Sequence, residues 1–245
     1  MIKNTMYHAD CLDESLGMSR LPDNSVDMIL CDLPYGTTRN KWDVIIDFDK
    51  LWYEYKRVIK ERGIIILTAS EPFTSQLIMS NKKWFKYDLI WKKTHPKGHL
   101  NAKRMPLRAH ESILIFYDKP PKYYPVMRKG KLRQKGNKGS SETRCYGKTK
   151  GYSALNDLYY PTSVIEIGNA NQRGKIHPTQ KPVELFEYLI KTYSQEGDIV
   201  LDNCIGSGTT AIACLNLNRY YIGFEKDDTY YESAMNRIEE WYQNE

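Results

Sequence analysis

Short, almost wholly apolar runs alternate with segments of helical periodicity in this chain, and that alternation restricts the fold more than any other feature. Residues 26–31 and 64–69 are apolar almost throughout, which is typical of strands buried on both faces. The pattern predicts an α/β fold with a doubly wound, mostly parallel sheet and helices on both faces. Helices are predicted over residues 51–63, 71–85, 182–194, 209–217 and 229–242, and further strands over 198–204 and 220–225.

Two more predicted strands, residues 87–93 and 111–119, are spaced as an antiparallel or mixed edge of the sheet. Periodicity then stops between about residues 119 and 175, where Gly, Lys, Ser, Asn and Tyr dominate. A stretch of that length is functional or mobile rather than a simple connection. We therefore predict that residues 1–118 and 175–245 are two halves of one domain and that residues 119–174 are an insert.

Basic residues are concentrated in one part of the chain. Residues 92–150 contain 17 Lys and Arg against three acids, a net charge of +14, whereas the rest contains 19 against 27, a net charge of −8. A basic block in an otherwise acidic protein indicates a polyanionic partner. Tyrosines in and beside the block favour nucleic acid, and a solvated loop is the alternative.

Several classes of protein are disfavoured by composition. The chain has no run of 18 apolar residues, and acids lie where a signal peptide would be apolar, so we expect no membrane partner and a cytoplasmic location. Its five cysteines are odd in number and form no C-x-x-C pair, which favours reduced thiols. His95 and His99 have a ligand-like spacing, but without a cysteine pair we expect no metal site.

The segment VLDNCIGSGTTAIAC, residues 200–214, predicts a strand, a glycine-rich turn and a helix. Asp202 ends the strand, and Gly206 and Gly208 allow the backbone to approach a ligand closely. Glu225 ends the next predicted strand, where a carboxylate can accept hydrogen bonds from ribose hydroxyls. Neither a complete G-x-G-x-x-G nor a phosphate-binding loop is present, and an ordinary tight turn gives a similar pattern. The combination fits a nucleoside joined to an amino acid, such as S-adenosylmethionine.

A second turn, DLPYG, follows the first apolar strand. Asp32 and the backbone carbonyl of Leu33 can each accept a hydrogen bond from the same amine. Tyr35 offers a flat ring on which a nucleobase can stack. The alternative is a turn that ends the strand and buries a core tyrosine.

These segments together resemble the amino-methylating DNA methyltransferases, whose catalytic motif is [D/N/S]-P-P-Y. DLPYG is similar to that motif, with Leu33 in place of the commoner proline, and LDNCIGSGTT is similar to the cofactor motif. HPTQKP, residues 177–182, is similar to the segment that precedes the cofactor motif in that family. The catalytic motif comes first in the chain, as in the permuted beta group. The resemblance implies a Rossmann-like, circularly permuted fold with a basic target-recognition insert.

The resemblance also implies site residues by position. Glu225 would bind the ribose of S-adenosylmethionine and Asp10 its adenine, although Asp10 could equally cap a helix or lie in an exposed loop. HPTQKP could equally be a helix entry signal. The implied catalytic loop is Asp32, Leu33, Pro34 and Tyr35. The implied cofactor residues are Asp10, Asp32, Thr179, Lys181, Asp202, Cys204, Gly206, Ser207, Gly208, Thr209, Thr210 and Glu225.

The implied reaction is direct methyl transfer to the N6 amine of an adenine flipped out of double-stranded DNA, without a metal. Aspartate at the first motif position is typical of the adenine enzymes. N4-cytosine methylation is an alternative, as is methylation of RNA or protein glutamine. A binding protein that keeps the fold without turnover is a further alternative, against which the intact Asp32, Tyr35 and glycine turn argue. Carbon-5 cytosine methylation is disfavoured because no Pro-Cys pair occurs. A homodimer and a cognate restriction endonuclease are further partners that the resemblance suggests.

Overall fold

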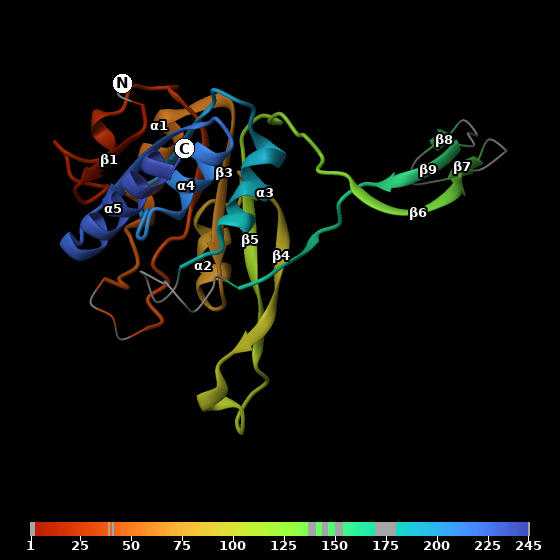
Figure 1. Cartoon of the computed structure of the whole chain (residues 1–245), viewed down its shortest axis with the longest axis horizontal. Coiled ribbons are helices and arrows are strands. Elements are labelled where there is room, and N and C mark those ends of the chain that lie inside the picture. The colour runs from red at the N-terminus through yellow and green to blue at the C-terminus, as the bar shows by residue number, and fades with distance from the viewer. Residues whose placement is uncertain are drawn as a thin grey trace. The chain divides into compact units, whose positions relative to one another are not determined.

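The computed structural model describes residues 3–38, 40, 42–136, 141–143, 147–149, 154–169 and 180–244. The chain divides into two compact units. The larger unit consists of Met1–Tyr124 and Ser163–Glu245, and the smaller of Pro125–Thr162. Figure 1 shows the larger unit as a twisted sheet with helices packed against it.

The sheet of the larger unit has eight strands in the order β1-β12-β11-β2-β3-β5-β4-β10. Neighbours from β1 to β3 are parallel, β5 is antiparallel to both β3 and β4, and β10 is parallel to β4. The predicted fold class and its antiparallel edge are therefore confirmed. The strands are β1 (Thr5–His8), β2 (Val26–Cys31), β3 (Ile59–Ala69), β4 (Phe85–Lys97), β5 (Arg108–Phe116), β10 (Val164–Ile167), β11 (Ile199–Asp202) and β12 (Tyr220–Glu225).

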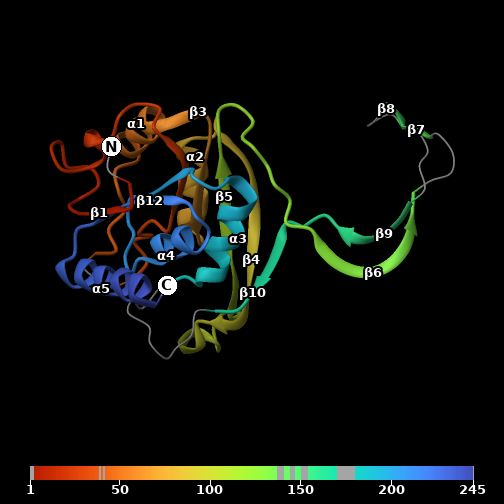
Figure 2. The same cartoon turned by 45° about the horizontal axis from the view of Figure 1, so that its top comes forward.

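Helices cover both faces of this sheet, as Figure 2 also shows. Successive side chains of a strand point to opposite faces, so Met28 and Leu30 pack into one core while Ile29 and Cys31 pack into the other. The first core contains α3 (Val183–Tyr193), α4 (Thr209–Asn216) and α5 (Asp228–Asn244), and the second contains α1 (Phe48–Val58) and α2 (Phe73–Ser80). Short 3₁₀ turns lie at Met18–Arg20 and His99–Asn101.

Two predicted helices extend too far. The helix predicted over residues 71–85 ends at Ser80, and β4 begins at Phe85. The helix predicted over residues 51–63 ends at Val58, and β3 begins at Ile59. Gly63 lies inside the strand, where a Cβ would come within 2.9 Å of the Asp27 carbonyl oxygen. The glycine therefore permits close approach of β3 to β2 rather than ending a helix.

The smaller unit is built from antiparallel pairs, in which β6 (Arg128–Lys135) pairs with β9 (Ala154–Tyr159) and β7 (Ser141–Thr143) with β8 (Gly147–Thr149). It lies within the predicted insert of residues 119–174. β10, which that prediction also included, is an edge strand of the main sheet because Ile165 pairs with Trp91. Among the residues that the structure describes, no helix has the length and apolar character needed to span a bilayer.

Candidate active site

Asp32 and Asp202 lie at the carboxyl ends of two neighbouring parallel strands. Asp32 directly follows β2 and Asp202 ends β11, and Leu201 is opposite Ile29 in the ladder. The chain continues from β2 to β3 on one side and from β11 to β12 on the other, so the strand order reverses between them. Ligands bind outside the strand ends at such a point. A cavity of about 480 Å³ lies there and is lined by residues of both turns.

Three side chains donate hydrogen bonds to the Asp32 carboxylate. Oδ1 accepts from the Tyr35 hydroxyl at 2.7 Å and from the Thr68 hydroxyl, and Oδ2 accepts from Lys181 Nζ at 2.5 Å. Thr68 belongs to β3 and Lys181 lies two residues before α3, so three separate chain segments fix one carboxylate. Because a carboxylate has about four acceptor positions, little remains free on Asp32 except on the side of Oδ2.

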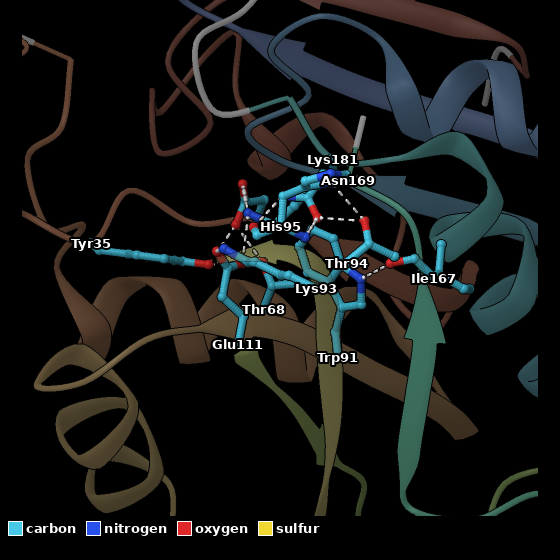
Figure 3. Close-up of polar contacts among 11 residues, drawn as sticks. Tyr35, Thr68, Trp91, Lys93, Thr94, His95, Glu111, Ile167, Asn169 and Lys181 are labelled. Atoms are coloured by element: carbon cyan, nitrogen blue, oxygen red, sulfur yellow. Dashed lines mark hydrogen bonds and ion pairs between the residues drawn. The ribbon is translucent and has the colours of Figure 1, made fainter. Parts of the chain in front are cut away.

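Lys181 is shared between two carboxylates. Its Nζ lies 2.5 Å from Asp32 Oδ2 and 3.2 Å from Glu111 Oε2, and the other oxygen of Glu111 pairs with Lys93. Lys181, Glu111 and Lys93 expose only 7%, 12% and 8% of their side chains. Figure 3 shows the two lysines converging on Glu111. We call Asp32, Lys181, Glu111 and Lys93 the charge chain, because its members alternate in sign and sum to zero.

The pKa values of the charge chain follow from this pairing. Burial would lower the pKa of Lys181, but Asp32 and Glu111 hold it above its ordinary value. Burial would raise the pKa of Glu111, but Lys181 and Lys93 hold it below its ordinary value. Burial and the two carboxylates raise the pKa of Tyr35 well above its ordinary value, so its hydroxyl stays a neutral donor.

Tyr35 has one ring face occupied. Its ring stacks on Phe73 with centroids 5.1 Å apart, and Lys181 Nζ lies 5.6 Å from the Tyr35 centroid. Stacking of a base on Tyr35, as predicted, must therefore use the ring face that Phe73 leaves open. Leu33 and Pro34, the other residues of the predicted loop, line the same cavity.

The glycine-rich turn is held together by Asp202. One carboxylate oxygen accepts a hydrogen bond from the Cys204 backbone N–H at 3.1 Å, and the other accepts one from the Thr210 hydroxyl. Burial raises the pKa of Asp202 to about 6. Gly208 has φ +76° and a Cβ there would lie 3.3 Å from that of Ala234, so the turn needs a glycine at this position.

Glu225 ends β12 and Asp10 follows β1, so both lie beyond β11 as seen from Asp32. The Glu225 carboxylate accepts hydrogen bonds from the backbone N–H groups of Gly206 at 3.0 Å and Asp227 at 2.9 Å. Burial raises its pKa, and these N–H groups oppose the rise. Asp10 accepts from the Leu12 backbone N–H and forms an ion pair with Lys226 at 3.4 Å.

Most of the predicted site residues come together at this cavity. Its lining includes Asp10, Asp32, Leu33, Pro34, Tyr35, Lys181, Asp202, Cys204, Gly206, Ser207, Thr209, Thr210 and Glu225. Gly208 does not line it and instead shapes the turn from behind. Thr179 lies outside the described residues.

Sequence reasoning missed several site residues. Lys93 and Glu111 line the cavity and lie in predicted strands, where a charged side chain within an apolar strand was the available signal. Thr68 also lies in a predicted strand and reaches the site through its hydrogen bond to Asp32. The aromatic residues Trp42, Phe224 and Tyr230 also line the cavity, and the Trp42 and Tyr230 rings meet edge-on with centroids 6.3 Å apart. Within the described ranges, no group of three or more His, Cys, Asp or Glu is arranged to hold a metal ion.

Comparison with known proteins identifies the family of this chain. The N6_N4_Mtase family model, described as DNA methylase, matches residues 26–236. The chain is 29% identical to the type II methyltransferase M.HpaI of Haemophilus parainfluenzae over 94% of its own length and 73% of that protein. It is also 29% identical to the type II methyltransferase M.HinfI of Haemophilus influenzae, over 97% and 68% of the two lengths.

Solved structures share the fold. The M1.HpyAVI–SAM complex superposes with a TM-score of 0.63 at 24% identity, covering 96% of this chain and 98% of that one. The PvuII DNA methyltransferase, described as cytosine-N4-specific, superposes with a TM-score of 0.65 at 15% identity, covering 99% and 92%. At these identities the two likenesses establish the fold alone.

Proposed function

Since the chain belongs to the N6_N4_Mtase family of DNA methylases, we propose that it transfers a methyl group from S-adenosylmethionine to the N6 amine of adenine in double-stranded DNA. One observation supports placing this reaction at the cavity. The anchored Asp32 carboxylate and the glycine-rich turn after β11 share one cavity at the point where the strand order reverses.

The residues around the turn fit S-adenosylmethionine. Glu225 has each carboxylate oxygen fixed by a backbone N–H and keeps acceptor positions for two ribose hydroxyls. Trp42, Phe224 and Tyr230 supply apolar surface for an adenine ring, and Asp10 can accept from its amine. When bound, S-adenosylmethionine supplies an electrophilic methyl group on a sulfonium sulfur.

Asp32 and Leu33 would receive the target amine. Oδ2 of Asp32 and the Leu33 carbonyl can each accept one of the two amine hydrogens, which orients the nitrogen lone pair toward the cofactor end of the cavity. Tyr35 and Thr68 hold the carboxylate in place without competing for Oδ2. Catalysis is then positioning together with electrostatic stabilisation of the positive charge that develops on the attacking nitrogen.

Adenine is favoured over cytosine because aspartate stands first in the motif. The amine of a paired base cannot reach Asp32 inside a duplex, so the base must leave the stack to enter the cavity. Exposed cations of the basic block would contact phosphates, and that binding would weaken steeply with salt. A homodimer, a cognate restriction endonuclease and a cytoplasmic location stay predictions.

The test uses purified protein, labelled S-adenosylmethionine and a mixed-sequence DNA duplex, followed by digestion to nucleosides. We expect the label in N6-methyldeoxyadenosine. N4-methyldeoxycytidine would overturn the choice of base, and label only in RNA or protein would overturn the substrate class. Asp32→Ala should lose at least about a hundredfold in rate, as removal of a group that stabilises a transition state does. Asp88→Asn, which changes an exposed carboxylate of β4, is the matched control.

A further inference from the structure

The hairpin formed by β4 and β5 extends past the other strands of the sheet, as Figure 1 shows. Trp91, Lys93, Lys97, Arg108 and Glu111 of its two strands line the cavity. The turn between the strands therefore lies directly beyond the wall of the site. Figure 2 shows the same projection from a second direction.

The tip of this hairpin carries two exposed apolar side chains. Leu100 lies in the 3₁₀ turn His99–Asn101 and is 102% exposed, and Met105 is 58% exposed. Gly98, at φ +96°, starts the turn, and no atom lies within 4 Å of a Cβ placed there. A single exposed leucine is unremarkable on a protein surface. Two apolar side chains at the end of a projecting turn, neither packed into a core, are a different arrangement.

Cations surround the tip without local acids. Residues 92–110 contain six Lys and Arg and no Asp or Glu. Lys92 pairs with Glu166 and Lys93 with Glu111. The other four are Lys97, Lys103, Arg104 and Arg108, all exposed, and none forms an ion pair with an acid of the described chain. Such a surface fits a polyanion, and it would repel another cationic tip.

The tip is also within reach of a base that enters the cavity. Leu100 is three residues from Lys97, which lines the cavity, and three residues of extended chain span at most about 11 Å. Leucine and methionine are among the side chains that proteins insert between base steps. A base that leaves the stack leaves a gap that an apolar side chain can fill.

From these observations we propose that the tip of the β4–β5 hairpin is a DNA wedge. Leu100, with Met105 beside it, enters the duplex where the target base leaves the stack, while Lys103 and Arg104 hold the flanking phosphates. The proposal rests on the proposed function, because it supposes a duplex substrate whose target base enters the cavity.

The test compares two oligonucleotide duplexes that carry a site found by sequencing the methylated mixed-sequence DNA. One has the target base normally paired, and the other places an abasic nucleotide opposite it, so that less stacking and pairing must be broken. On the paired duplex, Leu100→Ala should slow single-turnover methylation about tenfold, since unstacking a base step costs a few kcal/mol. On the abasic duplex the loss should shrink to less than about threefold, because leaving the stack costs least for an unpaired base.

Three further variants separate the wedge from other roles. Leu100→Met should keep most of the rate because it keeps an apolar wedge, and Met79→Ala, which removes an exposed side chain of α2, should have the wild-type rate on both duplexes. The double change of Lys103 and Arg104 to Gln should weaken binding to both duplexes and flatten its salt dependence. With 2-aminopurine at the target position, Leu100→Ala should lower the fluorescence gain on binding.

The results distinguish the two proposals. If the wild-type protein methylates no duplex, the proposed function fails. If it methylates the paired duplex and Leu100→Ala loses nothing, or loses equally on both duplexes, the wedge is overturned while the proposed function stands. A Leu100→Ala protein that changes from dimer to monomer, with an unchanged 2-aminopurine signal, would assign the tip to contact between copies of the chain instead.

Discussion

Replacing Glu111 with glutamine tests whether the charge chain stabilises the fold around the candidate active site. The change keeps the shape of the side chain but removes the negative charge between Lys93 and Lys181. Lys181 retains Asp32, whereas Lys93, only 8% exposed, loses its ion-pair partner. Removing one partner of a buried ion pair costs roughly 3–5 kcal/mol because a buried charge is left uncompensated.

We therefore expect the free energy of unfolding to fall by about 3 kcal/mol, the lower end of that range, because Lys181 stays paired. For a chain of this size, about 2–4 °C per kcal/mol predicts a midpoint lower by about 6–12 °C. The pKa of Glu111 is lower in the folded state, so its stabilisation is present above the unfolded pKa and is lost as the pH falls through the folded pKa. The difference between wild type and variant should be largest near neutral pH and shrink below about pH 4.

The neighbouring pair Lys92–Glu166 is a matched control. Its atoms are also close, with Lys92 Nζ 2.7 Å from Glu166 Oε1, but the side chains are 56% and 67% exposed. Water and salt screen an exposed ion pair, so Glu166→Gln should change the melting midpoint little. Thermal and urea unfolding from pH 3.5 to 8 measures both variants. Equal midpoints for the two variants would refute the reasoning from burial.

Three more predictions concern the other site residues. Tyr35→Phe removes a donor to the Asp32 carboxylate but keeps the ring on Phe73, so single-turnover methylation should slow about tenfold with little change in melting midpoint. Burial raises the folded pKa of Asp202 to about 6. The free energy of unfolding should therefore fall by roughly 2–3 kcal/mol as the pH rises from about 4 to 6. Asp202→Asn should remove this pH dependence in urea titrations. Lys181→Met removes the cation that most lowers the pKa of Glu111, so the acid limb of the pH–rate profile should move to higher pH, while Lys181→Arg should keep it in place.

The turns at the two central strand ends were predictable because each is local in sequence. An apolar run followed by an acid and a tight turn identifies Asp32 and Asp202 without any knowledge of distant contacts. Glu111 could not be placed in this way. It faces Trp91 across the antiparallel ladder, and Lys93, two residues further along the same face, reaches it diagonally. Only the register of β4 against β5 brings them together, and periodicity does not give register.

The error in the helix of residues 51–63 has the same origin. Val58 and Ile59 are apolar and continue the helical pattern, so nothing local marks the change from helix to strand. The decisive contact is long-range, because Ile59 pairs with Val26 at the start of β2. Tertiary pairing therefore overrides a local pattern that is equally compatible with both conformations.

Lys181 connects the two ends of the site, and this gives the segment before α3 a physical reason to be there. Its ammonium group binds Asp32 at the end of β2, while its backbone carbonyl accepts a hydrogen bond from the Thr209 hydroxyl at the start of α4, at 3.4 Å. The turn after β2 and the glycine-rich turn lie far apart in the chain, so neither fixes the other through local structure. A residue that contacts both sets the spacing between Asp32, the proposed amine acceptor, and the proposed cofactor site. Because an error of about 1 Å in such a spacing can cost about a hundredfold in rate, a buried lysine held by two carboxylates is better suited to this position than a flexible surface contact.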